Sequence, residues 1–149
     1  VKGDPRQTDG QKLQEQAAEE RGRTGMKLVT GGAYQGKLGY AKELYPDVVW
    51  KDGAECGLQD IETCEALDRF HLFVRRWLEA GRTKEELIDT VLKKNSGILL
   101  VCDEVGCGLV PVDAFEREYR EAAGRICTAF ADRADRVDRV VCGIGMRIK

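Results

Sequence analysis

Short apolar runs recur along the chain from residue 26 to its end, and they predict β-strands. The strongest is 98–102, Ile-Leu-Leu-Val-Cys, with five apolar residues in succession. A run without polar alternation is typical of a central parallel strand that is covered on both faces. Shorter runs predict four more strands, at 27–30, 48–50, 139–142 and 146–149.

The longest helical signal covers residues 57–80. Apolar side chains recur there at intervals of three and four, which places them on one face of a helix. Leu67, His71 and Val74 share that face, so His71 is expected to be a core histidine of one long helix. The alternative is a catalytic histidine that points out of the sheet edge toward phosphate. Gly81 follows the last periodic residue and ends the predicted helix.

Three further helices alternate with the predicted strands. Pro46 stops the first, Thr83 and Glu86 form a capping box for the second, and Pro111 with Asp113 starts the third. Strands that alternate with helices predict an α/β fold with a mostly parallel sheet flanked by helices. The last two strands, joined by a glycine turn, form a C-terminal hairpin in this prediction. The predicted helix that Pro46 stops covers 37–45, and the one that the capping box starts covers 83–94.

Residues 1–25 differ in composition from the rest of the chain. They contain five basic and five acidic residues and almost no large apolar ones. Such a segment buries too little apolar surface to offset the entropy lost on ordering. We therefore expect a disordered or non-native tail, followed by one domain over 26–149. The alternative is an arm that binds a partner.

Composition narrows the class of protein. The chain has 149 residues, of which 42% are hydrophobic and 34% charged, which suits one domain with a real core. A net charge of −2 gives no electrostatic footprint for nucleic acid. No run approaches the roughly 18 apolar residues of a membrane span. The polar start lacks the apolar segment of a secretory signal, so a cytoplasmic protein is expected.

The cysteines are expected to be reduced thiols that pack as small hydrophobic groups. None forms a C-x-x-C pair and the chain has one histidine, which argues against a structural zinc site. Disulfide or redox chemistry is the alternative. The six cysteines are Cys56, Cys64, Cys102, Cys107, Cys127 and Cys142.

A glycine-rich segment supplies the strongest chemical signal. Gly31, Gly36 and Lys37 satisfy the spacing G-x-x-x-x-G-K, directly after a predicted strand and before a predicted helix. In a phosphate-binding loop, backbone N–H groups and the helix dipole face the phosphates, and the lysine reaches the β- and γ-phosphates. An ordinary glycine turn is the alternative. The predicted phosphate-binding residues are Gly31, Gly32, Ala33, Tyr34, Gln35, Gly36, Lys37 and Leu38.

Two acidic residues follow the strongest predicted strand. Asp103 and Glu104 stand at its carboxyl end, where ligands of open α/β sheets bind. A carboxylate there can hold Mg²⁺ directly or through water. The alternative is that these side chains cap a loop turn.

Four blocks of sequence, 26–37, 99–111, 119–126 and 140–149, resemble the adenosylcobinamide kinase / adenosylcobinamide-phosphate guanylyltransferase family. The resemblance implies a RecA-like P-loop NTPase fold and a cytoplasmic homo-oligomer. It also implies an enzyme of cobalamin biosynthesis. Such an enzyme uses GTP or ATP to phosphorylate a corrinoid, adenosylcobinamide, and then transfers GMP onto that phosphate through a guanylylated histidine.

The resemblance also assigns roles to residues and shows departures. It implies that Lys37 and Glu104 are catalytic and that Glu104, with Asp103, holds Mg²⁺. Leu38 stands where the family has a serine whose hydroxyl ligates the metal. Tyr34 and Gln35 also depart from the family loop, and the segment that bears the guanylylated histidine is missing. A catalytically impaired nucleotide-binding pseudoenzyme is therefore the alternative function.

Overall fold

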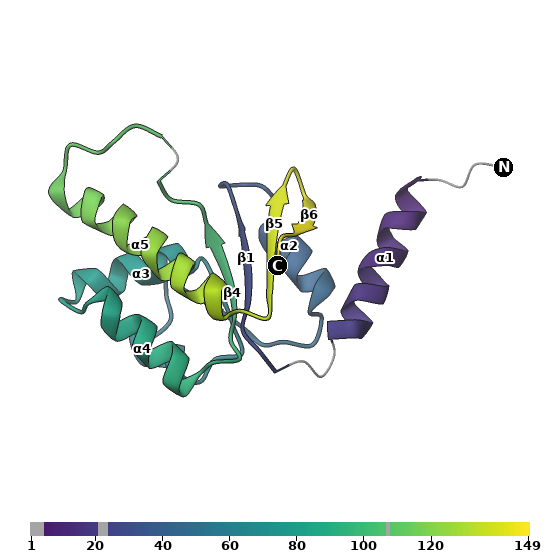
Figure 1. Ribbon diagram of the computed structural model, residues 1–149, viewed down its shortest axis with the longest axis horizontal. Helices are drawn as coiled ribbons and strands as arrows, with labels where there is room; N and C mark the ends of the chain where they lie inside the picture. The colour runs from purple at the N-terminus through teal and green to yellow at the C-terminus, as the bar shows by residue number, and fades with distance from the viewer. Residues whose placement is uncertain (1–4, 21–23, 107) are drawn as a thin grey trace.

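A mixed six-stranded sheet forms the centre of the protein (Figure 1). The computed structural model describes residues 5–20, 24–106 and 108–149. The strand order is β2-β3-β4-β1-β5-β6, with parallel pairing everywhere except between β5 and β6. This arrangement confirms the predicted α/β fold and its C-terminal hairpin. The strands are β1 Lys27–Gly31, β2 Trp50–Asp52, β3 Ala66–Asp68, β4 Leu99–Asp103, β5 Arg136–Val141 and β6 Ile144–Arg147.

Helices cover the sheet on both faces. Figure 1 shows α3, α4 and α5 on one side and α1 and α2 on the other. No helix in the described part of the chain is long and apolar enough to cross a membrane. The helices are α1 Pro5–Glu20, α2 Lys37–Leu44, α3 Phe70–Glu79, α4 Lys84–Lys94 and α5 Ala114–Arg133, with a short 3-10 helix at Leu58–Glu62.

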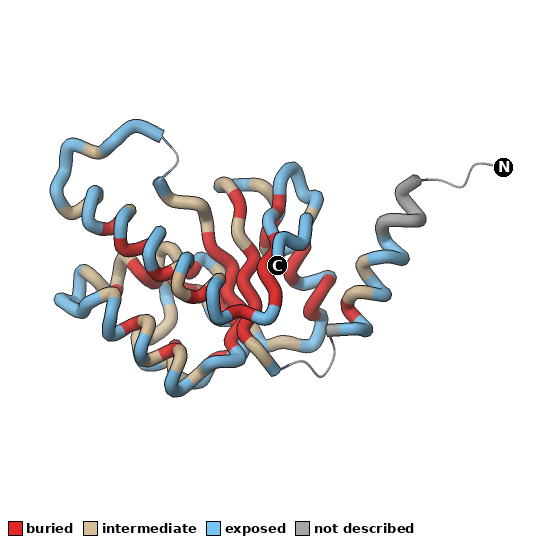
Figure 2. Tube along the Cα trace, viewed as in Figure 1, coloured by how far each residue is buried: buried red, intermediate tan, exposed pale blue. Residues whose placement is uncertain are grey.

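Strand β4 separates two apolar cores. Leu100 and Cys102 belong to the core under α3, α4 and α5, whereas Leu99 and Val101 belong to the core under α2. Successive side chains of a strand point to opposite faces, so a strand buried on both faces has no polar alternation. Figure 2 shows this burial as a red band through the central strands. The prediction from the apolar run at 98–102 is therefore confirmed.

The long helix predicted over 57–80 is wrong. The structure divides this segment into the 3-10 helix, strand β3 and helix α3. In β3, Ala66 and Leu67 are fully buried, and Leu67 lies in register with Leu100 of β4. The pairing of β3 with β2 and β4 thus outweighs the helical periodicity of the local sequence. Only the part of the segment that forms α3 is an α-helix. Arg69, with a φ of 51°, makes the sharp turn between β3 and α3.

The predicted helix starts after residue 80 are confirmed. The hydroxyl of Thr83 accepts a hydrogen bond from the backbone N–H of Glu86, whose carboxylate accepts one from the N–H of Thr83. This reciprocal pair satisfies two N–H groups that the first turn of α4 leaves without partners. Asp113 caps α5 through a single bond, in which its carboxylate accepts from the N–H of Glu116.

Strand β5 begins at Arg136 rather than at Arg139, where the apolar run begins. Arg136 and Asp138 are charged, yet both are about 1% exposed. They form an ion pair with 2.7 Å between Nε and Oδ2, and the Tyr40 hydroxyl donates to Asp138 Oδ1 at 2.9 Å. Hydropathy could not reveal these strand residues because a buried charge needs a partner that only the fold supplies.

The segment expected to be a disordered or non-native tail contains helix α1. Helix α1 packs on α2, and its Ala17 is 6% exposed, with Leu13 against the same core. Gln16 Oε1 accepts a hydrogen bond from Arg136 at 3.0 Å. This small docking patch was missed because α1 is polar overall and, among its described side chains at 10–19, only Ala17 is buried. Residues 1–4 and 21–23 lie outside the described residues, and the domain boundary at Met26 stays a prediction.

Candidate functional site

The glycine-rich segment forms a turn between β1 and α2, as predicted. A Cβ atom at Gly31 would lie 2.4 Å from the backbone oxygen of Val140, so only glycine fits there. Gly36 precedes α2 with a φ of 82°, a left-handed conformation that glycine adopts without steric cost. The fold therefore requires glycine at the two positions that define the motif.

The loop is fastened to the C-terminal hairpin. The backbone oxygen of Gln35 accepts a hydrogen bond from Gly143 at 2.7 Å, and its side-chain oxygen accepts one from the N–H of Cys142 at 2.6 Å. Gln35 thus holds the loop to the turn between β5 and β6. Its neighbour Tyr34 is fully exposed, with a φ of 58°.

Lys37, the first residue of α2, is buried below the loop. Its Nζ donates to the backbone oxygen of Gly32 at 2.6 Å and lies 2.6 Å from Asp103 Oδ1. A buried ammonium is stable only where partners replace its water. The loop carbonyl and the β4 carboxylate supply those partners, so this pair joins the two predicted motifs.

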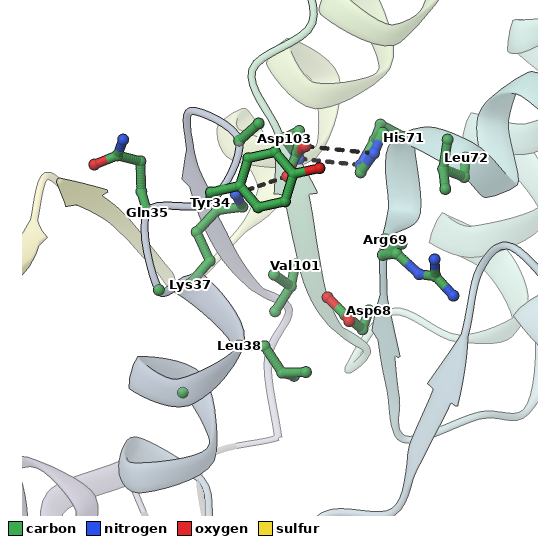
Figure 3. A pocket seen from close by; sticks show the side chains of 13 residues that line it. Tyr34, Gln35, Lys37, Leu38, Asp68, Arg69, His71, Leu72, Val101 and Asp103 are labelled. Carbon is green, nitrogen blue, oxygen red and sulfur yellow. Dashed lines mark hydrogen bonds and ion pairs between the residues drawn. The ribbon is translucent and has the colours of Figure 1, made fainter. Parts of the chain in front are cut away.

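His71 lies beside Asp103 and was not predicted to be there. Its Nε2 is 3.5 Å from Asp103 Oδ2, and its Nδ1 accepts a hydrogen bond from the backbone N–H of Asp103 at 3.2 Å. Burial lowers the pKa of His71, partly offset by the charge of Asp103. The expectation of a core histidine is wrong, because His71 lies in the first turn of α3 and faces the site (Figure 3).

A pocket of about 470 Å³ joins these elements. Every residue from Ala33 to Leu38 lines it, together with His71 and Asp103. Of the predicted loop residues, Gly31 abuts β5 and Gly32 supplies the carbonyl that holds Lys37. The loop and the end of β4 are therefore two walls of one pocket, as the position of both motifs at the carboxyl ends of strands predicts.

Asp68, at the end of β3, forms a third wall of the pocket and was missed. Within the described residues its carboxylate has no hydrogen-bond or ion-pair partner, unlike Asp103. Figure 3 shows it directed toward the side of the pocket where Leu38 lies, whereas Arg69 points away and pairs with Asp52. Asp68 was missed because strand β3 was not predicted. An acidic residue directly after the apolar pair Ala66 and Leu67 was a signal that could have indicated it.

Glu104 lies apart from this pocket. Arg139 donates to its two carboxylate oxygens at 2.9 and 3.1 Å, a bidentate ion pair. Glu104 lines a different pocket, with Tyr119 and Arg120 of α5. The structure thus separates the two acids that the sequence treats as one motif, and the roles expected for Glu104 stay predictions.

Mg²⁺ in this pocket would need oxygen ligands. Among the described residues, no cluster of three or more His, Cys, Asp and Glu side chains could hold a metal ion. Mg²⁺ in phosphoryl-transfer sites needs only one or two carboxylates, because substrate phosphates and water complete its shell. Asp68, whose carboxylate is unpaired, fits that requirement, whereas Leu38 has no oxygen to offer.

A family model described as cobinamide kinase / cobinamide phosphate guanyltransferase matches residues 59–148, more than half of the chain. The chain belongs to this family. The match contains Asp68, His71 and Asp103, so it confirms the family resemblance there. The loop at 31–37 precedes it, and the assignment of the loop therefore rests on its spacing and geometry.

Three curated relatives in this family match shorter segments. The bifunctional adenosylcobalamin biosynthesis protein CobU of Salmonella typhimurium is 46% identical over 52 residues, 35% of this chain and 29% of the relative. CobU of Escherichia coli is 38% identical over 65 residues, 44% and 36% of the two chains. CobP of Pseudomonas aeruginosa is 35% identical over 66 residues, 44% and 38%. The matched segments span about a third of each relative.

Proposed function

We propose that this protein is a nucleotide-dependent transferase that phosphorylates a cobinamide with GTP or ATP. The observation that carries the proposal is the Lys37–Asp103 pair, which lies beneath a phosphate-binding loop in a chain of the cobinamide kinase family. The catalytic role of Lys37 and the nucleotide-binding role of the loop belong to this proposal. Homo-oligomerisation is part of it as well.

Nucleotide phosphates would occupy the pocket beside residues 33–38. The N–H groups of the loop and the positive end of the α2 dipole attract anionic oxygens. Lys37 would exchange the carbonyl of Gly32 and the carboxylate of Asp103 for phosphate oxygens, as the loop lysine does in P-loop enzymes. The ammonium would thereby keep charge partners throughout binding.

Mg²⁺ would be held by Asp68, and the ion would neutralise charge on the phosphates when bound. The sequence instead predicts Glu104 and Asp103 as the Mg²⁺ ligands. Glu104, however, is ion-paired with Arg139. Asp103 contacts Lys37 and His71. Once Lys37 turns to phosphate, Asp103 Oδ1 is released while Oδ2 still faces His71. Asp103 would then orient the cobinamide hydroxyl and accept its proton.

Guanylyl transfer has weaker support than the kinase step. His71 is the only histidine of the chain, and Asp103 contacts both of its ring nitrogens. A histidine nucleophile needs a free lone pair, so His71 would have to leave Asp103 to accept GMP. The pseudoenzyme alternative is not favoured, because the chain belongs to the cobinamide kinase family and keeps a lysine and a carboxylate in one pocket.

A transfer assay tests the proposal. Purified protein, adenosylcobinamide, Mg²⁺ and GTP or ATP labelled on the γ-phosphate should give a labelled corrinoid that chromatography separates from nucleotide. Lys37→Ala should abolish the product. Lys42→Ala, on the exposed face of the same helix, is the matched control and should retain it. Failure of the unaltered protein to label the corrinoid with either nucleotide would refute the kinase function.

A further inference from the structure

Two cysteine side chains meet behind the pocket, on the opposite face of β4. Cys102 of β4 and Cys127 of α5 have their sulfur atoms 3.6 Å apart. Cys102 is 1% exposed, whereas Cys127 is partly exposed. The two residues come from different elements, so packing of α5 on the sheet produces their contact. A pair at this distance is a dithiol rather than two isolated core cysteines.

The dithiol is directly coupled to the proposed site through one peptide unit. Cys102 points toward α5, and the next residue, Asp103, points toward the pocket. The N–H of the Cys102–Asp103 peptide bond donates to His71, and the Asp103 carboxylate pairs with Lys37. A covalent change at Cys102 therefore acts on the backbone that holds both contacts.

We propose that Cys102 and Cys127 are a modification site that forms an intrachain disulfide when the protein reacts with a peroxide. The sulfur of Cys127, the partly exposed partner, attacks one peroxide oxygen; the O–O bond breaks, and Cys127 becomes a sulfenic acid with release of water. The sulfur of Cys102 then attacks the Cys127 sulfur, the S–O bond breaks, and a second water leaves. In sum, two thiols and hydrogen peroxide give one disulfide and two waters.

Bond formation must bring the two sulfur atoms from 3.6 Å to about 2.05 Å. This approach draws the carboxyl end of β4 toward α5. It shifts the Asp103 backbone away from the geometry in which Asp103 holds Lys37 and His71. Oxidation should therefore weaken nucleotide binding, a consequence that rests on the proposed function, whereas disulfide formation itself does not.

Peptide mapping tests the modification. The full chain is treated with hydrogen peroxide, its remaining thiols are alkylated, and it is digested with trypsin and a protease that cleaves after glutamate. Trypsin places Cys127 in the peptide 126–133. Cleavage after Glu104 separates Cys102 from Cys107, which lies outside the described residues. The expected product is a peptide containing Cys102 linked to 126–133, and it should disappear after reduction with dithiothreitol.

Three variants make the result decisive. Cys127→Ser should abolish the linked peptide. Cys142→Ser removes an exposed cysteine with no thiol partner among the described residues and should leave it unchanged. Cys102→Ser should leave a sulfenic acid at Cys127 that dimedone traps. A different pairing, or no linkage while the exposed Cys142 is oxidised, would overturn the proposal.

Nucleotide affinity tests the coupling separately. The dissociation constant for GTP should rise about fivefold or more on oxidation and return on reduction, and Cys127→Ser should show no such change. A disulfide that forms without changing GTP affinity would overturn the coupling. If the reduced protein binds no GTP, the proposed function fails, and peptide mapping still decides the disulfide.

Discussion

Lys37 Nζ lies 2.6 Å from Asp103 Oδ1, which joins the glycine-rich loop to the end of the central strand β4. Both residues were expected to serve a nucleotide site, but the sequence did not place them in contact. The ion pair explains how the Lys37 ammonium is stable at 7% exposure. It also means that an incoming phosphate must compete with Asp103 for the ammonium group.

Lys37→Ala should lower affinity for GTP about tenfold to a hundredfold, because a charge-assisted contact to phosphate contributes roughly 1.5–3 kcal/mol. Isothermal titration calorimetry on the variant and the unaltered protein measures the change. Lys42→Ala should bind GTP normally. Equal affinities for Lys37→Ala and the unaltered protein would exclude the phosphate-loop function of residues 31–37.

Substitutions of Asp68 and Glu104 should differ in how they change the effect of Mg²⁺ on GTP affinity. Asp68→Asn should remove most of the increase in GTP affinity that Mg²⁺ produces, because it neutralises the unpaired carboxylate of the pocket. Glu104→Gln should leave that increase intact, since Glu104 serves Arg139. Calorimetry with and without MgCl₂ gives both values. The reverse pattern would restore the sequence-based assignment of the metal to Glu104.

Much of the site was predictable because its signals are local. Strand β1, the loop and the start of α2 follow from glycine spacing and a lysine, and β4 follows from an apolar run that needs no partner to be recognised. Asp103 was found because it ends that run. These features depend on residues that are close in sequence, so the amino-acid sequence alone is enough to predict them.

The missed parts depend on contacts between distant residues. Strand β3 has three residues, and pairing with β2 and β4 stabilises it where the local pattern favours a helix. That error concealed Asp68 and placed His71 in the core. Likewise, Glu104 looked equivalent to Asp103 until the fold placed Arg139 beside it. The local sequence around an acidic residue does not indicate which distant basic residue the fold will place beside it.

Leu38→Ser should strengthen Mg²⁺-dependent GTP binding. Leu38 lines the pocket on the side of Asp68, so a hydroxyl there would add an oxygen where P-loop enzymes supply a metal ligand. The Mg²⁺ dependence of GTP affinity should increase relative to the unaltered protein, and Leu38→Ala should show no gain. An equal gain in both variants would mean that space, rather than the hydroxyl, is responsible.

The buried pair of Arg136 and Asp138 should be the costliest charged interaction to break. Asp138→Ala leaves a buried guanidinium without its main partner and should lower the free energy of unfolding by about 3–5 kcal/mol. Tyr40→Phe removes only the hydroxyl that donates to Asp138, for a smaller loss of about 1.5–3 kcal/mol. Urea denaturation measures both. Glu43→Gln, an exposed change on α2, serves as the control, and a Tyr40→Phe loss as large as that of Asp138→Ala would contradict the ranking.

Stability should fall in mildly acidic solution because of His71. Burial lowers the pKa of His71 in the folded protein below its usual value of about 6.5, so between the two pKa values the unfolded chain binds more protons. The free energy of unfolding should therefore be highest above about pH 6.5 and decrease as the pH falls below it toward the folded pKa. His71→Gln should flatten this decrease relative to the unaltered protein, since glutamine does not titrate. Urea denaturation of both proteins from pH 5 to 8 measures the free energy of unfolding. Both proteins keep Asp103 and Lys37, so the difference between their pH profiles is the contribution of His71. If stability instead rose as the pH fell through this range, the charge of Asp103 would outweigh burial, and His71 would be a protonated partner of Asp103 rather than a neutral one.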